Sequence, residues 1–534
     1  MRGKRINAAL MLRLAASVVW AFLPILWLKV LGSVSVGYLT GPYIMLLFGY
    51  GVLIPGFQSA FIHGLRVRLH REQMQNISRI FHRTLPVACL VGVVLALAGA
   101  FGAMGLSELF TSSRRGTLVW LVMAPALLLM GPQGVLEGYL AGLDLAKAVL
   151  ARVISAGVAL FASILLSIPF GRYGEKVAAL LHTEDLADVY AAVGVAAGLS
   201  LGSLAGLIYL IVLYLIHRRQ LDERLRSGSG LVLDGRRDVI ARGRYTLVSY
   251  GLPELLLAVD AVMYRLTAMR VHPTEQNTAN IGLFMGGVIA LCAVIGILCC
   301  IPYLSSWSSL CVAVRRGDLS GARGRMDRLV HFGGILLFPV VLWLMILAEP
   351  VCAVIAGQSA ADAAAPLLVI TAPVIILFAT ALLISYVIME MGRFGILVID
   401  LVLGGVMHLI VLLILCLVQG YGLHALIAAW AAGLFVMDLA GTLEICGMLS
   451  YRQEWIRGLA MPFLCAAGSA AIVAMLEKWL IYQIGEVLTI MVAVIVALVI
   501  YMVALVLCRA LNRYELERVP FGRFLMPLAE RLER

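Results

Sequence analysis

The sequence has few charged residues. Asp, Glu, Lys and Arg make up 13% of its 534 residues, and 62% are hydrophobic, whereas a soluble domain averages about 25% charged residues. So little charge excludes a water-soluble globular protein. We therefore predict an all-α polytopic membrane protein, because helices satisfy their own backbone hydrogen bonds in lipid.

The chain also has no cysteine motif and no long polar loop. Its ten cysteines lie mostly inside apolar runs, and the adjacent pair Cys299–Cys300 is not a C-x-x-C motif. Neither a zinc site nor a redox site is expected. The longest segment predicted outside the membrane, about 171–190, is too short for the catalytic loop of a membrane glycosyltransferase. We predict no enzyme activity, no metal and no cofactor, and we disfavour a non-transporting scaffold.

Apolar runs long enough to cross a bilayer as a helix, about 20 residues, recur along the chain. Fourteen spans are predicted, at residues 9–31, 38–62, 84–106, 118–140, 149–170, 191–216, 244–268, 281–304, 330–357, 365–389, 395–418, 422–449, 458–481 and 486–510.

The net charge of +11 might suggest a nucleic-acid partner, but its distribution follows the membrane topology. Most of the 41 Lys and Arg lie in segments predicted on the same side of the membrane as the N-terminus. The richest of these segments are 63–83, 217–244 and 509–534. Positively charged loops stay in the cytoplasm. We predict a multi-pass protein of the cytoplasmic membrane with both termini in the cytoplasm, in contact with anionic lipids and without a nucleic-acid partner.

The halves of the chain echo each other. Segment 56–85 parallels 304–332, and segment 124–160 parallels 372–410. The two members of each pair are separated by about the same number of residues along the chain. Six spans per repeat preserve orientation, so two parallel six-helix repeats are predicted around a central cavity. The predicted domains are an N-lobe at 1–216, a cytoplasmic linker at 217–243, a C-lobe at 244–449, additional spans at 450–510 and an interfacial tail at 511–534.

Several runs carry a family resemblance. They include "GPQGVLEGYLAGLDLAKAVLARVISAGVALF", "YGLPELLLAVDAVMYRL" and "IMEMGRFGILVIDLVLGGVMHLIVLLILCLV". These runs resemble the polysaccharide-transport and lipid II flippase branch of the multidrug/oligosaccharidyl-lipid/polysaccharide (MOP) exporters, closest to the stage V sporulation protein B group related to MurJ. The resemblance implies fourteen spans, two lobes and alternating access.

The same resemblance implies a cargo. It points to a flippase for an undecaprenyl-linked oligosaccharide precursor, such as lipid II, serving cell-wall, spore-cortex or polysaccharide synthesis together with enzymes of those routes. A cation-coupled, MATE-like exporter of small molecules is the alternative. The MurJ branch is associated with arginines in its first two spans. Here the first span has only Arg13 and Lys29, near its ends, and the second has no Lys or Arg before the loop.

The seventh span carries three ionisable groups, Glu254, Asp260 and Arg265, which are costly in hydrocarbon. On a helix Glu254 and Arg265 differ by about 20° in direction and lie about 16 Å apart along the axis. We predict a polar wall for a headgroup or a coupling cation. The alternative is that Asp260 pairs with a neighbouring helix and that Arg265 reaches toward the interface.

Other polar residues in the second half extend this hypothesis. Asp400 and His408 lie on the eleventh span and Asp438 on the twelfth. Together with Asp260 they are candidates for coupling transport to H⁺, to Na⁺ or to the membrane potential, with His408 as the natural proton sensor. Each of them is alternatively a satisfied contact between helices.

Two candidate groups lie on the inner side of the first half. Glu137 and Arg152 flank a short turn and are predicted as an inner-gate ion pair, with a purely structural turn as the alternative. Gln58 and His63 close the second span and are candidates to meet a headgroup.

Overall fold

The computed structural model describes most of the chain, and all its regular structure there is helical. The described residues are 2–70, 73–183, 186–226, 235–268, 274–417, 421–511, 516, 525–527 and 531. The all-α prediction is confirmed for them. The His63 side chain, part of the predicted linker 217–243 and most of the predicted tail 511–534 lie outside the described residues.

Twelve helices among the described residues are long and apolar enough to cross a membrane, and a bent pair raises the number to 13. The bent pair, Gln358–Thr371 and Val374–Met389, turns by 50° within the predicted span 365–389. The predicted span 244–268 is helical, as part of α9 (Gly235–Ala268), but it is not among the twelve. A multi-pass membrane protein is therefore confirmed, and fourteen spans are not.

The segment 171–190, predicted as an outer loop, is mostly helix. α7 (Leu150–Leu181) and α8 (Leu186–Arg226) run through nearly all of it. Residues such as Ala, Leu, Glu and Lys in "GEKVAALL" favour helix even where the segment is polar. α7 ends at Leu181, and the next residue, His182, has a left-handed φ of 52° that stops the helix.

The chain forms two compact units. Unit 1 takes Met1–Leu291 and Arg393–Gly433, and unit 2 takes Cys292–Gly392 and Leu434–Arg534. These packing units do not coincide with the predicted lobes, because α9 packs on α2 (Ser33–Gly51) and α3 (Phe57–His70) within unit 1. The division into an N-lobe and a C-lobe stays a prediction.

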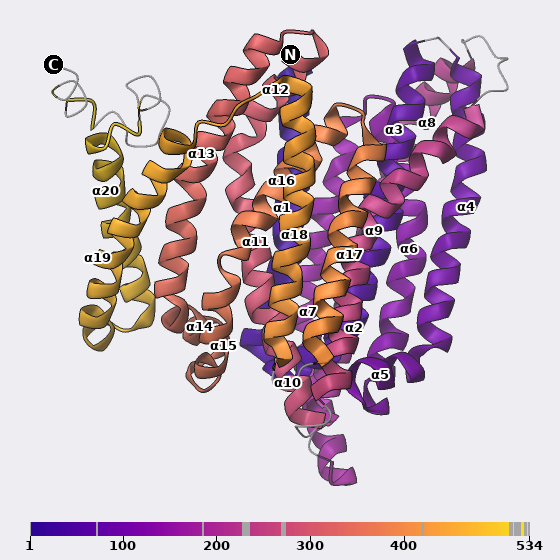
Figure 1. Ribbon diagram of the computed structural model, residues 1–534. Coiled ribbons are helices and arrows are strands. Elements are labelled where there is room, and N and C mark those ends of the chain that lie inside the picture. The colour runs from indigo at the N-terminus through magenta and orange to yellow at the C-terminus, as the bar shows by residue number, and fades with distance from the viewer. Residues whose placement is uncertain are drawn as a thin grey trace. The chain divides into compact units, whose positions relative to one another are not determined.

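The remaining helices follow in chain order (Figure 1). Unit 1 also contains α1 (Arg2–Leu31), α4 (Met74–Phe101), α5 (Ala103–Thr111), α6 (Thr117–Gly142), α10 (Thr274–Leu283), α17 (Phe394–Leu417) and the first half of α18 (Gly422–Leu449). Unit 2 contains the second half of α18, most of α11 (Ala290–Cys300), and α12 (Leu304–Arg315), α13 (Leu319–Ile346), α14 (Ala348–Ala356), α15 (Gln358–Thr371), α16 (Val374–Glu390), α19 (Met461–Ile484) and α20 (Glu486–Leu507).

The last two predicted spans form a helix pair within unit 2. α19 and α20 run side by side (Figure 1), and α19 packs on α13 while α20 packs on α14. The Trp343 indole donates a hydrogen bond to Ser469 Oγ at 3.0 Å, and the Tyr501 hydroxyl donates to the Ile335 carbonyl at 2.9 Å. Both bonds satisfy polar groups that hydrocarbon could not.

A stripe of glycines joins α7 to α8 in unit 1. A Cβ added at Gly198 would lie 2.3 Å from the backbone nitrogen of Ser163, and one at Gly202 would lie 2.7 Å from the Ser155 carbonyl oxygen. Small residues four apart let two membrane helices approach at backbone distance. The stripe consists of Gly194, Gly198, Gly202 and Gly206.

Gly198→Val is expected to destabilise unit 1 by about 1–3 kcal/mol, because backbone atoms of α7 occupy the space of the new side chain. Thermal unfolding of the detergent-solubilised protein measures this loss. Gly157→Val on α7 is the matched control, since a Cβ there meets no atom within 4 Å. Equal melting temperatures for the two variants would contradict the packing role of Gly198.

Candidate functional site

A buried carboxylate and imidazole meet in unit 1. Asp260 on α9 and His408 on α17 are joined by a hydrogen bond of 2.9 Å between Oδ1 and Nε2. The Trp430 indole on α18 donates to Asp260 Oδ2 at 2.6 Å. Asp260 is 0% exposed and His408 1%. We call these three residues the aspartate–histidine site.

Close helix packing positions the aspartate–histidine site. A Cβ at Gly433 on α18 would lie 2.8 Å from the Gly404 carbonyl oxygen and 2.9 Å from His408 Cβ. α17 and α18 therefore approach closely just where His408 projects. The indole of Trp430 stands edge-on to the His408 ring, with centroids 4.9 Å apart. The imidazole is held between its carboxylate partner and this aromatic ring.

The aspartate–histidine site pairs a carboxylate with two ring N–H groups. Each carboxylate oxygen of Asp260 accepts a hydrogen bond from a ring nitrogen. His408 Nδ1, the ring nitrogen that faces away from Asp260 Oδ1 in this hydrogen bond, is buried without a hydrogen-bond partner among the described residues.

The predicted coupling set is only partly assembled here. Asp260 and His408 meet, as the hypothesis required, and Trp430 was missed. Asp400 is buried on α17, 3% exposed, with an interaction of its own. Asp438 belongs to unit 2, where its Oδ2 atom lies within hydrogen-bond distance of the Thr380 hydroxyl. The ion-coupling role of all four acidic and histidine candidates stays a prediction.

A second buried group in unit 1 is a closed triad of Gln58, Glu137 and Arg152, here called the arginine cluster. Arg152 Nε lies 2.8 Å and 3.0 Å from the two Glu137 oxygens. Gln58 donates to Glu137 Oε1 at 2.6 Å and accepts from Arg152 Nη2 at 2.6 Å. The predicted pairing of Glu137 with Arg152 is present, and Gln58 completes it.

Local packing explains why Gln58 reaches the ion pair. Gly138 on α6 follows Glu137, and a Cβ there would lie 3.1 Å from Gln58 Cα. A π-helical turn at Val52–Gly56 carries α2 into α3, and Gly134 lets that turn approach α6 at backbone distance. α3 thus lies directly against the helix that carries Glu137.

Three further residues surround the arginine cluster. Tyr50 on α2 and Tyr250 on α9 interact with Arg152, and Arg13 on α1 interacts with both Arg152 and Glu137. Arg13 Nε is buried and has no hydrogen-bond partner among the described residues. Among the described residues named here, two arginines stand against one glutamate, an excess of positive charge. Arg13 was not a candidate, because it lies near the end of its apolar run.

Arg265 has the contacts of a helix cap. Its guanidinium donates to Ser112 Oγ at 2.7 Å and to the Leu109 carbonyl at 3.2 Å, at the C-terminus of α5. Cations are favoured there by the helix dipole. These contacts fit the structural alternative. The proposed role of Arg265 in a polar wall stays a prediction.

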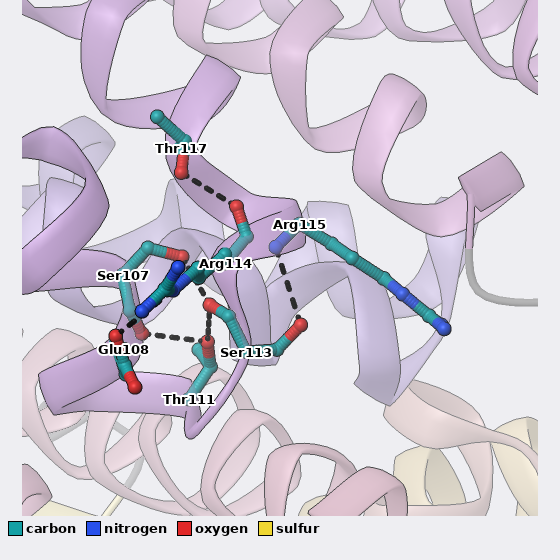
Figure 2. Close-up of polar contacts among 7 residues, drawn as sticks. All are labelled: Ser107, Glu108, Thr111, Ser113, Arg114, Arg115 and Thr117. Atoms are coloured by element: carbon teal, nitrogen blue, oxygen red, sulfur yellow. Dashed lines mark hydrogen bonds and ion pairs between the residues drawn. The ribbon is translucent and has the colours of Figure 1, made fainter.

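The turn that follows α5 is held by its own hydrogen bonds (Figure 2). The Ser107 hydroxyl donates to the Ser113 carbonyl at 2.6 Å, and Arg114 Nε lies 3.2 Å from Glu108 Oε2. The Arg114–Glu108 ion pair is exposed, with side chains 70% and 50% accessible. Exposed pairs contribute little to stability. The Ser107–Ser113 hydrogen bond therefore holds the turn in which Ser112 accepts the hydrogen bond from Arg265.

Glu254 differs from its neighbours on α9. Its Oε2 atom is buried and has no hydrogen-bond partner among the described residues. An unsatisfied carboxylate oxygen in a membrane helix is costly. Glu254 therefore remains a candidate for contact with cargo or water. The other candidate for such a contact, His63, has a side chain that lies outside the described residues.

Comparison with known proteins establishes the fold. The structure matches a lipid II flippase MurJ in an inward closed conformation, with a TM-score of 0.64 and 11% identity over 93% of this chain and 97% of that one. An inward-facing MATE-family transporter of the MOP superfamily matches with a TM-score of 0.61 and 15% identity, over 81% and 94% of the two chains.

A MOP superfamily transporter from Pyrococcus furiosus matches with a TM-score of 0.51 and 16% identity, over 84% of this chain and 95% of that one. No protein-family model and no curated protein matches the sequence. The chain therefore has the fold that these transporters share, in agreement with the fold that the resemblance implied. At these identities the likeness concerns the fold alone, and the sporulation-protein branch stays a prediction.

Proposed function

We propose that the chain is a flippase that moves an undecaprenyl-linked sugar precursor, such as lipid II, from the inner to the outer leaflet by alternating access. The lipid tail stays in the bilayer, while the sugar pyrophosphate head needs a polar route. In this proposal both termini lie in the cytoplasm, as the distribution of Lys and Arg indicates.

The observation that carries the proposal is the excess of positive charge at Arg13 and the arginine cluster. Glu137 offsets Arg152 at 2.8 Å, whereas Arg13 is half-buried and its Nε atom has no hydrogen-bond partner among the described residues. A cation within a membrane protein is unfavourable unless an anion pairs with it. A phosphate head supplies such an anion, and arginine is suited to bind it.

The alternative, a cation-coupled exporter of small molecules, has support from the matches to MATE transporters. Two observations favour the flippase. The MurJ match leaves only 7% of the chain uncovered, fewer residues than α19 and α20 contain together, so it includes at least part of this helix pair. Exporters of cationic compounds need acidic surfaces, whereas the cluster at Arg13 and Arg152 is net positive.

Arg13→Gln is expected to slow flipping about ten- to a hundredfold, because a charge-assisted hydrogen bond contributes about 1.5–3 kcal/mol. The assay follows a fluorescent-headed undecaprenyl-linked muropeptide in proteoliposomes, scored by access of an external quencher. Arg172→Gln is the matched control, since Arg172 is exposed at the far end of the same helix as Arg152.

The two candidate functions give different results in this assay. Protein-dependent flipping that Arg13→Gln removes and Arg172→Gln retains supports the flippase. Absence of flipping across several lipid-linked sugars, together with ion-driven export of small cationic dyes from the same vesicles, would establish the exporter instead.

A further inference from the structure

Unit 2 contains a carboxyl group deep in a membrane helix. Asp438 is the seventeenth residue of α18, in the span Gly422–Leu449, and is 9% exposed. Its Oδ2 atom lies 2.5 Å from the hydroxyl oxygen of Thr380 on α16. Neither residue takes part in the arginine cluster or in the aspartate–histidine site.

The surroundings of Asp438 do not support a negative charge. Among the described residues no Lys, Arg or His pairs with Asp438, and its Oδ1 atom is buried without a hydrogen-bond partner. An ionised carboxylate offers about four acceptor positions, and only one is used here. Burying such an anion without a counter-ion is strongly unfavourable, whereas the neutral acid avoids this cost.

The hydrogen-bond geometry at Thr380 fits the neutral acid. Thr380 Oγ1 lies 2.5 Å from Asp438 Oδ2, 2.9 Å from the Ile376 carbonyl oxygen and 3.0 Å from the Leu377 carbonyl oxygen. A hydroxyl has one proton for these three acceptors. If Asp438 carries a proton, it donates to Thr380, and Thr380 donates to its own helix. Both hydrogen bonds then form at once.

We propose that Asp438 and Thr380 form a proton-binding site in unit 2, with the proton held on Asp438 in this conformation. Release breaks the O–H bond of the carboxyl, leaves the electron pair on oxygen and passes the proton to water. The resulting carboxylate needs a donor at Oδ1, so release requires water to reach α16 and α18. Proton release is thereby linked to the opening of this helix pair.

Other titratable groups on the two helices are placed differently. Tyr386 on α16 stacks on Trp307 at a centroid distance of 5.2 Å. On α18, His424 and Glu444 are exposed and Cys446 is half-buried, and the Glu390 side chain on α16 lies outside the described residues. Asp438 is therefore the group of this pair whose charge state the helix packing controls.

Isotope-edited infrared spectroscopy of the full-length protein, labelled with ¹³C-carboxyl aspartate, tests the site without any cargo. At neutral pH we expect the band of one protonated aspartic acid to disappear in Asp438→Asn. In Thr380→Val the band should move to the frequency of a carboxyl that lacks its hydroxyl partner. Asn is nearly isosteric with Asp, and thermal unfolding confirms that each variant is folded.

Asp362→Asn is the matched control, because Asp362 is an exposed aspartate of unit 2, and it should leave the protonated band unchanged. A spectrum of Asp438→Asn identical to that of the wild type would overturn the proposal. The inference adds a second proton-binding group to the proposed transporter. Because this readout is spectroscopic, the proton site can be disproved while the flippase is confirmed. Equally, the flippase can be disproved while the proton site is confirmed.

Discussion

Asp260→Asn is expected to remove the response of transport to a pH gradient. Asn cannot stabilise a protonated His408, because the attraction between carboxylate and imidazolium is lost together with the 2.9 Å charge-assisted contact. A charge-assisted hydrogen bond contributes about 1.5–3 kcal/mol to stabilising the protonated imidazole. We therefore expect the gradient-driven rate to fall about ten- to a hundredfold, toward the level without a gradient.

The measurement compares transport in proteoliposomes with an imposed pH gradient, an imposed Na⁺ gradient or neither. His408→Gln should reproduce the loss, since it removes the group that changes its proton occupancy. Asp144→Asn serves as the matched control in unit 1, because Asp144 is exposed and Asn tolerates its left-handed φ of 66°.

A Na⁺-driven rate that Asp260→Asn abolishes would contradict proton coupling at this site. It would mean that the hydrogen bonds from His408 and Trp430 open to admit a cation. A rate insensitive to both gradients in the wild type would instead remove the coupling role from the aspartate–histidine site altogether.

The helical architecture could be predicted because membrane spans leave a strong sequence signal. Apolar runs of about 20 residues located nearly every long helix, including α19 and α20. The predicted span 244–268 shows where hydropathy is a poor guide, because it is helical but is not among the twelve helices that are apolar enough to cross a membrane. Its charges satisfy helix contacts such as Asp260 with His408, which hydropathy cannot register. The packing of α9 within unit 1 also depends on contacts that no periodicity reveals.

The candidate site could be predicted in part. Ionisable residues in an apolar run indicate a functional or paired position, which selected Asp260, His408, Glu137 and Arg152. Trp430 could not be found in this way, because an indole reads as hydrophobic until its N–H has a partner. Gln58 was selected for a headgroup, yet its amide completes an ion pair on two other helices.

Glu137→Gln is expected to destabilise the protein by about 3–5 kcal/mol, since it leaves Arg152 buried without its counter-ion. The two side chains are only 0% and 7% exposed, so solvent cannot replace the lost partner. Thermal or denaturant unfolding in detergent measures the change. Glu175→Gln on α7 is the matched control, as Glu175 is exposed.

Replacing both partners separates a structural role from a gating role. A buried ion pair replaced by neutral groups of similar volume is often no less stable, so Glu137→Gln with Arg152→Met should recover most of the stability lost by either change alone. A double variant that is stable but cannot transport indicates that the arginine cluster opens and closes during the cycle. A double variant that is stable and active would limit the cluster to holding α3, α6 and α7 together. Single variants that each cost less than about 1 kcal/mol would contradict both roles, because a buried pair with this geometry must then already be hydrated.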